Sequence, residues 1–286
     1  MRIRRTIVAI ALTFVSLPGL SAQTSADTKV LADLEWETNT TADGLTHKRA
    51  LVPDLYGGPQ HINLVEIPKG ARLRYGIAVS EMKKTSVISA EHGALASING
   101  SYYNMSTGSS VCFLKVGKEL IDTTIASEFD LRITGAVRVN QRRCQILPWN
   151  LKAEKSYRSN KGAVLASGPL MLEDGDICSW NECDSSFIAT KHPRSAIFTT
   201  KDGKTVFITV DGRSKGNAIG MSIPELAHLV AALGAEDALN LDGGGSTTLW
   251  LDGAPDSGVL NCPSDNRTFD HAGERSIPNL IYVYRP

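Results

Sequence analysis

Short runs of apolar and β-branched residues recur along the chain and predict a protein built mainly of strands. Such runs lie at 61–67, 72–79 and 94–99, each bounded by turns rich in Gly, Pro or Lys, and further runs lie at 111–116, 135–139 and 162–167. No internal repeat is visible among them. The pattern therefore predicts a sheet-rich domain.

One segment has helical periodicity instead. Ser222 stands at the N-cap position, Pro224 follows in the first turn, and Glu225 completes a capping box. Apolar residues then recur at helical spacing as far as Leu233, and Gly234 supplies a stop. The spacing predicts a helix over 222–233, between short strands at 205–210 and 238–241.

Strand, helix and strand follow one another over 205–241, which is typical of a right-handed βαβ unit with parallel strands. Each strand ends in an aspartate followed by a glycine, at Asp211 and Asp242. The two carboxylates start about 5 Å apart if the strands are neighbours and about 10 Å apart if one strand intervenes. Because α/β folds bind ligands at this edge, both aspartates are candidate catalytic residues. The predicted class is α/β, or mixed α+β, in a single domain with a mixed, twisted β-sheet and few helices.

Composition and charge narrow the range of partners. The chain has 286 residues, of which 42% are hydrophobic and 21% charged, so it can bury a sizeable core. Thirty basic residues balance thirty acidic ones. Because the positive and negative charges balance, the protein as a whole has no electrostatic field that attracts nucleic acid, and we expect no binding of nucleic acid. Any anion must be recognised by a local group of charges.

The N-terminus has the three-part layout of a secretory signal peptide: arginines, an apolar run from Ile7 to Leu17, and small residues ending at Ala22. The run is shorter than the ~20 residues that span a membrane. We expect residues 1–22 to be removed, residues 23–57 to form a leader or edge segment, and residues 58–286 to form the functional domain. The mature protein is predicted to be exported, periplasmic or secreted, with no membrane span.

Five cysteines are present, at Cys112, Cys144, Cys178, Cys183 and Cys262. Cys178 and Cys183 bracket the loop CSWNEC and are predicted to pair in an oxidising compartment. No CxxC pair or neighbouring histidine has the spacing of a zinc site. None of the five lies in a context that activates a thiol, so structural or incidental roles are expected.

The turn after Asp242 combines glycines with hydroxyls. Glycine is costly to order, so a glycine triplet needs a reason. A turn without side chains can aim successive backbone N–H groups at one point and form a nest for an anion. This interpretation makes binding candidates of Gly243, Gly244, Gly245, Ser246 and Thr247. The alternative is a plain tight turn between two strands.

Arginines and a polar strand end extend the candidate site. Arg194 and Arg213 stand beside proline or glycine at strand borders. Arginine is the side chain best suited to bidentate binding of phosphate or carboxylate. Asn99 ends a predicted strand shortly before Tyr102 and Tyr103, whose rings can stack on a sugar. The alternative for that segment is a β-bulge or hairpin turn.

Six segments, taken in order, resemble the phosphodiester glycosidase domain. They are SINGSYYN (97–104), ASGPLML (166–172), KHPRSAIF (191–198), VDGRS (210–214), MSIPELAHLVAALGAEDALNLDGGGSTTLW (221–250) and ERSIPNLIYVY (274–284). The resemblance covers roughly residues 60–285, and NLDGGGS is its most diagnostic part. One departure lies at 99–103. The family typically has NGG followed by two aromatic residues, whereas this chain has NGS followed by two tyrosines.

The resemblance implies hydrolysis at the anomeric carbon of a sugar joined through a phosphodiester, which releases free sugar and a phosphate monoester. The partner it implies is a phosphoglycan or a glycosyl phosphodiester. The polar positions of the family fall on Asn99, Arg194, Asp211, Arg213, Asn240, Asp242 and Ser246. Asp242 or Asp211 would stabilise the oxocarbenium ion or activate water, while arginines hold the departing phosphate. Whether the configuration is retained or inverted depends on the separation of the two carboxylates.

Two other functions stay open. In a metal-dependent phosphodiesterase, Asp211 and Asp242 would bind Ca²⁺ or Mg²⁺ with Asn240, and the P–O bond would break. In a non-catalytic module of the cell envelope, the same arginines and tyrosines would bind anionic glycans. No Walker loop, dinucleotide GxGxxG unit or GxSxG elbow is present, so no cofactor is predicted beyond such a cation.

Overall fold

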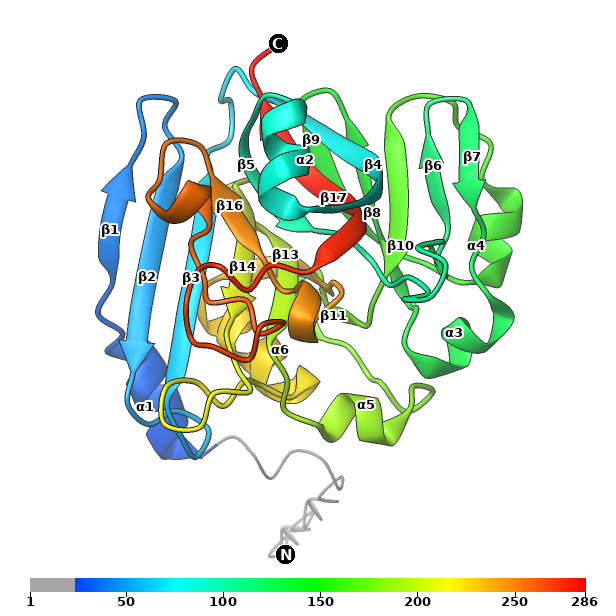
Figure 1. The fold of residues 1–286 in the computed structure, drawn as a ribbon. Helices are drawn as coiled ribbons and strands as arrows, with labels where there is room; N and C mark the ends of the chain where they lie inside the picture. Colours follow the sequence, from blue (N-terminus) through cyan, green and yellow to red (C-terminus); the bar gives the residue numbers. More distant parts are fainter. Residues whose placement is uncertain (1–23) are drawn as a thin grey trace, which may run out of the picture.

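The computed structural model describes residues 24–286, so the predicted signal peptide at 1–22 lies outside the described residues (Figure 1). The eight-stranded sheet has the order β1 (Glu37–Thr40), β2 (Thr46–Val52), β3 (Gln60–Ile67), β14 (Thr205–Val210), β13 (Arg194–Thr200), β15 (Ala235–Asn240), β11 (Leu170–Glu173), β12 (Asp176–Ile177). The five-stranded sheet has the order β7 (Glu119–Asp122), β6 (Leu114–Val116), β10 (Ala163–Ser167), β8 (Gly135–Asn140), β9 (Arg143–Pro148). The four-stranded sheet has the order β16 (Leu249–Leu251), β5 (Ala94–Asn99), β17 (Ser276–Tyr284), β4 (Arg74–Lys84).

Short helices connect and cover these sheets. They are α1 (Ser25–Ala32), α2 (Thr85–Glu91), α3 (Ala126–Leu131), α4 (Leu151–Ser156), α5 (Ser185–Ala189) and α6 (Ile223–Ala232), with 3-10 turns η1 (Gly244–Ser246) and η2 (Asp256–Gly258). Strands outnumber helices, as the run pattern predicted, and the chain has the expected mixed class. Residues 24–57 contribute α1, the edge strand β1 and its neighbour β2.

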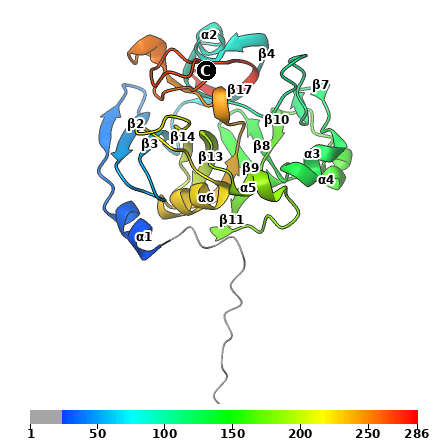
Figure 2. The ribbon, with the colours of Figure 1, turned by 60° about the horizontal axis from the view of Figure 1, so that its bottom comes forward.

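The alternation of side chains in the central strands builds two cores. Ile197 and Phe207 face a core that all three sheets share. Their neighbours Phe198 and Ile208 face the opposite side, where α6 covers the eight-stranded sheet. The helix α6 lies between α1 and α5 on this face (Figure 2).

The predicted helix is confirmed, together with its cap. The Ser222 hydroxyl accepts from the Glu225 amide, and the Glu225 carboxylate accepts from the Ser222 amide at 2.8 Å. Leu226 and Leu229 of α6 are fully buried against the sheet. Burial of this apolar face anchors the connection between β14 and β15.

The strand–helix–strand unit takes the wider of the two predicted geometries. β14 and β15 run in the same direction, but β13 lies between them and is antiparallel to both. Every strand pairing within residues 24–286 is in fact antiparallel. The ends of β14 and β15 are therefore about 10 Å apart at the same edge.

The predicted pairing of Cys178 with Cys183 is not formed, and both are free thiols. Hydrogen bonds shape this loop instead. The Cys178 amide donates to Met171, the Cys183 amide donates to Trp180, and the Trp180 indole N–H donates to the Leu170 carbonyl. The partly buried Trp180 indole thus ties this loop to β11.

Candidate active site

Asp242 lies where β15 and β5 end together. Its amide donates to the Gly100 carbonyl at 3.0 Å, and its carbonyl accepts from the Asn99 side chain at 2.7 Å. Asn99 is buried and also accepts from the Thr248 amide and the Ser195 hydroxyl through Oδ1. One asparagine at the end of β5 thus joins three segments and fixes the backbone on both sides of the glycine turn.

Four arginines from distant parts of the chain gather around Asp242. Arg132, after α3, and Arg275, before β17, both stabilise its carboxylate electrostatically. The negative charge of Asp242 also acts on Arg194, the first residue of β13, and favours the charged form of its guanidinium. Arg213, after β14, lies against the glycine turn that follows Asp242. Arg132 also pairs with Glu128, and Arg275 also pairs with Asp265. The half-buried Asp242 carboxylate therefore stands among four guanidinium groups, two of which have a second carboxylate partner.

The pKa of Asp242 is raised above the ordinary value for an aspartate. Burial is the largest cause, because it penalises the charged form. The Ser246 hydroxyl, the Arg132 guanidinium, the Gly243 amide and the Arg275 guanidinium oppose this effect without cancelling it. Perturbation by burial together with specific charges is typical of functional carboxylates.

The glycines after Asp242 admit the arginines. A Cβ at Gly244, where φ is +61°, would lie 2.9 Å from Nη2 of Arg213. A Cβ at Gly245 would lie 2.4 Å from Nη2 of Arg275. Any side chain at 244 or 245 would displace a guanidinium, which gives the glycine triplet its physical reason.

Substitution of Gly245 by alanine tests this close approach. We expect Gly245→Ala to lower kcat/KM about 10- to 100-fold, because displacement of a positioned cation by about 1 Å has effects of that size. Arg275→Ala introduced into the Gly245→Ala background should add little, since both changes remove the same contact. Additive losses in steady-state kinetics of the single and double variants would contradict this explanation.

The predicted nest of backbone N–H groups is not formed. The amide of Gly243 donates to the Asp242 carboxylate, and that of Gly244 donates to the Pro193 carbonyl. The amides of Ser246 and Thr247 donate within the 3-10 turn η1. Because these four of the five predicted amides are used within the protein, the turn does not present the row of free N–H groups that an anion nest requires.

Three buried hydroxyls of the same turn lack partners. Ser246, Thr247 and Thr248 are 1%, 0% and 0% exposed, yet their hydroxyl oxygens make no hydrogen bond within the described chain. The Ser246 hydroxyl is close enough to Asp242 and Tyr103 to favour their charged forms, although its geometry completes no bond to either. Unpaired buried polar groups are rare in native proteins and occur at functional sites.

Tyr102 and Asn240 support the end of β15 from beneath. The Tyr102 hydroxyl donates to the Gly168 carbonyl at 2.6 Å, and the Asn240 side chain donates to that carbonyl and to the Tyr102 hydroxyl, both at 2.8 Å. Tyr102 is buried, and the Arg132 guanidinium carbon lies 3.7 Å from its ring centroid. The ring therefore supports Arg132 and is not open to a sugar.

Arg194 is almost fully buried, and carbonyl oxygens hold its side chain. Nε donates to Met221 at 2.9 Å, and Nη2 donates to Thr190 at 2.7 Å and to Phe187 at 3.3 Å. Burial, aided by the charge of Arg213, lowers the pKa of Arg194 to about 10. The structure thus fixes one cation rigidly beneath the site, whereas Arg213 is exposed.

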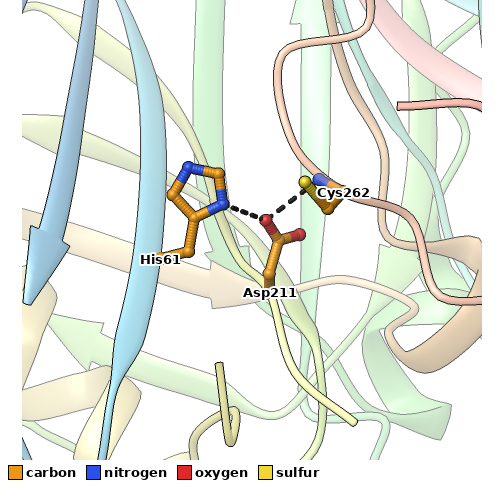
Figure 3. Close-up of side chains that lie close together, drawn as sticks. All are labelled: His61, Asp211 and Cys262. Carbon is orange, nitrogen blue, oxygen red and sulfur yellow. Dashed lines mark hydrogen bonds and ion pairs between the residues drawn. The ribbon is translucent and has the colours of Figure 1, made fainter. Parts of the chain in front are cut away.

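Asp211 forms a cluster with His61 and Cys262 (Figure 3). It is fully buried at the end of β14, and its carboxylate accepts from His61 Nδ1 at 2.6 Å, Asn261 Nδ2 at 2.9 Å and the Cys262 amide at 2.9 Å. His61 is on β3, on the side of β14 away from β15. Asn261 also donates to the Thr247 carbonyl, so Asn261 links Asp211 to the glycine turn.

The His61, Asp211 and Cys262 side chains lie together, with ligand atoms within 4.8 Å of one another. Burial and the nearby Asp211 carboxylate raise the pKa of the Cys262 thiol to about 12, so it is not a thiolate. Three N–H groups already donate to the Asp211 carboxylate. These donors fit a hydrogen-bonded structural cluster better than a cation site.

Sequence reasoning missed Arg132 and Arg275 as members of this site. Arg275 stands in the segment ERSIPNL, but its neighbours carry no turn signal of the kind that marked Arg194 and Arg213. Arg132 caps a six-residue helix far from Asp242 in sequence. Only the packing of α3 on Tyr102 brings this guanidinium to the carboxylate.

One family model matches most of the chain, and two curated relatives match parts of it. The phosphodiester glycosidase family model matches residues 92–284. The mouse N-acetylglucosamine-1-phosphodiester alpha-N-acetylglucosaminidase is 24% identical over 206 residues, which cover 66% of this chain and 37% of that protein. The uncharacterized protein YomE of Bacillus subtilis, derived from the SPbeta prophage, is 43% identical over 63 residues, which cover 22% of this chain and 10% of that protein. The chain thus matches only a minor part of either curated relative.

Solved structures share the fold. The catalytic domain of the zebrafish N-acetylglucosamine-1-phosphodiester alpha-N-acetylglucosaminidase, described as auto-inhibited by its pro-peptide, superposes with a TM-score of 0.66 at 16% identity and 88% coverage of both chains. A hypothetical protein from Synechocystis superposes with a TM-score of 0.64 at 15% identity, covering 88% of this chain and 64% of its own. At these identities the likeness concerns architecture alone.

Proposed function

The chain belongs to the phosphodiester glycosidase family, and from this premise we propose that it hydrolyses the glycosidic C–O bond of a sugar-1-phosphodiester. The products are free sugar and a phosphate monoester. The observation that carries the proposal is the half-buried Asp242 carboxylate among four guanidinium groups, of which Arg132 and Arg275 also pair with Glu128 and Asp265. This arrangement combines a group that stabilises positive charge with groups that hold a dianion.

The proposed chemistry divides these roles by charge. Positive charge develops at the anomeric carbon as the glycosidic bond breaks, and Asp242 stabilises it or activates the attacking water. The departing phosphate oxygen gains negative charge, which Arg213 and Arg275 neutralise through the gap at Gly244 and Gly245. A phosphate leaves readily without protonation, so the reaction needs only one carboxylate at the reacting centre.

We propose this chemistry without a bound divalent cation. Sharing of Ca²⁺ or Mg²⁺ between Asp211 and Asp242 would require Asp211 to release three hydrogen bonds. The cation would also lie among arginines that act on Asp242. Both features oppose a metal-dependent phosphodiesterase.

The proposal includes export of the enzyme. The basic, apolar and small-residue order of the first 22 residues supports it. Within the described part of the chain, no helix combines the length and apolarity needed to cross a bilayer. A glycan of the cell envelope or the exterior is thus the substrate class that we favour.

Isotope labelling tests the bond that breaks. Purified protein is incubated with N-acetylglucosamine-1-phospho-methyl-mannoside in ¹⁸O-water, with and without EDTA, and the products are weighed by mass spectrometry. We expect the label in the released sugar and equal rates in both conditions. Label in the phosphate, or loss of turnover in EDTA, would favour the metal-dependent phosphodiesterase. Binding without turnover, also for the glucose and galactose analogues, would favour a non-catalytic module.

The raised pKa of Asp242 predicts a pH dependence. If the ionised carboxylate is required, the acid limb of kcat/KM lies above the ordinary pKa of an aspartate. Arg275 lowers the pKa of Asp242, so Arg275→Gln should move this limb to higher pH in addition to weakening binding. Arg158→Gln, which changes an exposed residue after α4, is the control and should leave the limb in place. A limb that stays in place in Arg275→Gln would contradict the assignment.

A further inference from the structure

A second cleft lies at the far end of β17 from Asp242. It has a volume of about 840 Å³ and lies between the start of β4, the β8–β9 hairpin and the end of β17. Arg275 at the active site immediately precedes β17, and Tyr284 in this cleft is its last residue, so at ~3.3 Å per residue the two lie about 25–30 Å apart. The cleft is therefore separate from the candidate active site.

The charge of this cleft has one sign. Arg74, Arg142, Arg143 and Lys161 line it, and no aspartate or glutamate does. All four are exposed, and within residues 24–286 their side chains form no ion pair. A neighbouring cleft shares Arg142 and Arg143 but mixes its charges, with four carboxylates at Glu173, Asp174, Glu236 and Asp237. Although the chain has zero net charge, these unpaired cations create a local positive potential that attracts an anion.

Two tyrosines add flat apolar surface beside these cations. The rings of Tyr282 and Tyr284 lie 5.3 Å apart with an interplanar angle of 31°, and both are half-buried. Tyr282 packs directly on the backbone at Gly76, where a Cβ would lie 2.4 Å from its ring, and its edge meets His92. The ring is thereby held against β4, with its hydroxyl oxygen 2.6 Å from where a Cβ of Gly76 would lie.

The backbone holds the cations in position as well. Gln141 adopts a left-handed φ of 52° in the β8–β9 turn, and its carbonyl accepts from the Tyr75 amide at 2.7 Å. This bond ties the turn that carries Arg142 to β4. Gly162 approaches so closely that a Cβ would lie 2.0 Å from the Val139 carbonyl, which brings Lys161 to the same hairpin. The cleft is built rather than formed by chance overlap of mobile side chains.

We propose that this cleft binds a phosphate-bearing glycan chain at a distance from the bond that is hydrolysed. The inference rests on the proposed function and specifies its substrate class: a polymer with repeated phosphates and not an isolated glycosyl phosphodiester. Cations meet the phosphates and tyrosine faces meet the sugar rings. Attachment at two points raises the effective concentration of the chain at Asp242.

Single-stranded nucleic acid is the main rival, because cations and aromatic rings also bind stacked bases. The overall charge balance opposes it, since nucleic-acid-binding domains are typically strongly basic and this chain carries thirty residues of each sign. The rival is kept as an outcome of the test.

The test uses Arg142→Glu/Arg143→Glu in the full chain, with Lys152→Glu/Lys155→Glu on exposed α4 as the charge-matched control. The polymeric probe is poly(N-acetylglucosamine 1-phosphate), and the short one is N-acetylglucosamine-1-phospho-methyl-mannoside. We expect the cleft variant to lose about tenfold or more in affinity for the polymer by calorimetry and in kcat/KM on it. Turnover of the short substrate and the thermal midpoint should be unchanged in both variants.

Binding is also measured with Asp242→Asn as the parent, so that failure of catalysis is distinguished from failure of the cleft. If the cleft variant loses polymer affinity, the proposed binding in the cleft is supported. If, in addition, no variant and no parent shows turnover, the proposed reaction is contradicted. Unchanged polymer affinity, or an equal loss in the α4 control, would overturn the inference. So would tighter binding of an oligothymidylate than of the phosphoglycan.

Discussion

Replacement of Asp242 by asparagine is expected to lower kcat about 10³- to 10⁴-fold, the range for loss of a positioned carboxylate that acts on the reacting centre. The change keeps the size of the side chain and leaves the backbone bonds of residue 242 to Gly100 and Asn99 in place. It removes only the charge that the arginines surround. A large loss of turnover in a folded protein is therefore the expected result.

The effect on stability should have the opposite sign. Because the folded-state pKa of Asp242 is raised, the folded protein binds more protons than the unfolded chain between the ordinary pKa and the raised one. The contribution of this group to stability therefore falls as pH rises through that window. At neutral pH the charged form costs folding free energy, so Asp242→Asn should leave the free energy of unfolding unchanged or slightly raise it.

Steady-state kinetics and urea unfolding of the same preparations measure both effects. Asp174→Asn is the matched control, because Asp174 is exposed and its left-handed φ of 52° suits asparagine equally well. The control should keep full turnover. Near-normal kcat in Asp242→Asn would remove this residue from the mechanism, and a strong loss of stability would assign it a structural role.

Local signals account for the parts of the fold that the sequence predicts well. The capping box at Ser222 and Glu225 sets the start of α6 through hydrogen bonds over three residues, and α6 forms as predicted. The strand end at Asn99 is likewise visible from the apolar run before it. These features depend on neighbours in the chain, so inspection of short segments suffices.

Features made by tertiary contacts are not visible in this way. The glycines at 244 and 245 were predicted to expose amides, whereas their structural reason is the approach of Arg213 and Arg275 from other segments. The insertion of β13 between β14 and β15 depends on sheet order, which the strand pattern does not specify. Recognition of Arg132 as a site residue would have required the position of α3 in space.

The other candidate carboxylate, Asp211, is expected to act on folding more than on catalysis. Asp211→Ala would leave His61 Nδ1, Asn261 Nδ2 and the Cys262 amide without their shared acceptor inside the protein. Removal of one partner from a buried charged cluster costs roughly 3–5 kcal/mol. We expect a loss of that size in the free energy of unfolding, measured by urea titration, whereas Asp176→Ala at an exposed site on β12 should change it little.

Asp211→Asn separates positioning from catalysis, because it keeps one oxygen acceptor and can be assayed at low temperature where the protein is still folded. Asn261 connects Asp211 to the Thr247 carbonyl, so a looser cluster should lower turnover only modestly, by loosening the turn that carries the arginine contacts. The acid limb of the pH profile, which reports Asp242, should stay where it is in the parent. If folded Asp211→Asn lost as much kcat as Asp242→Asn, the two aspartates would have to share the reaction, and the cluster with His61 would be part of the catalytic machinery instead of its support.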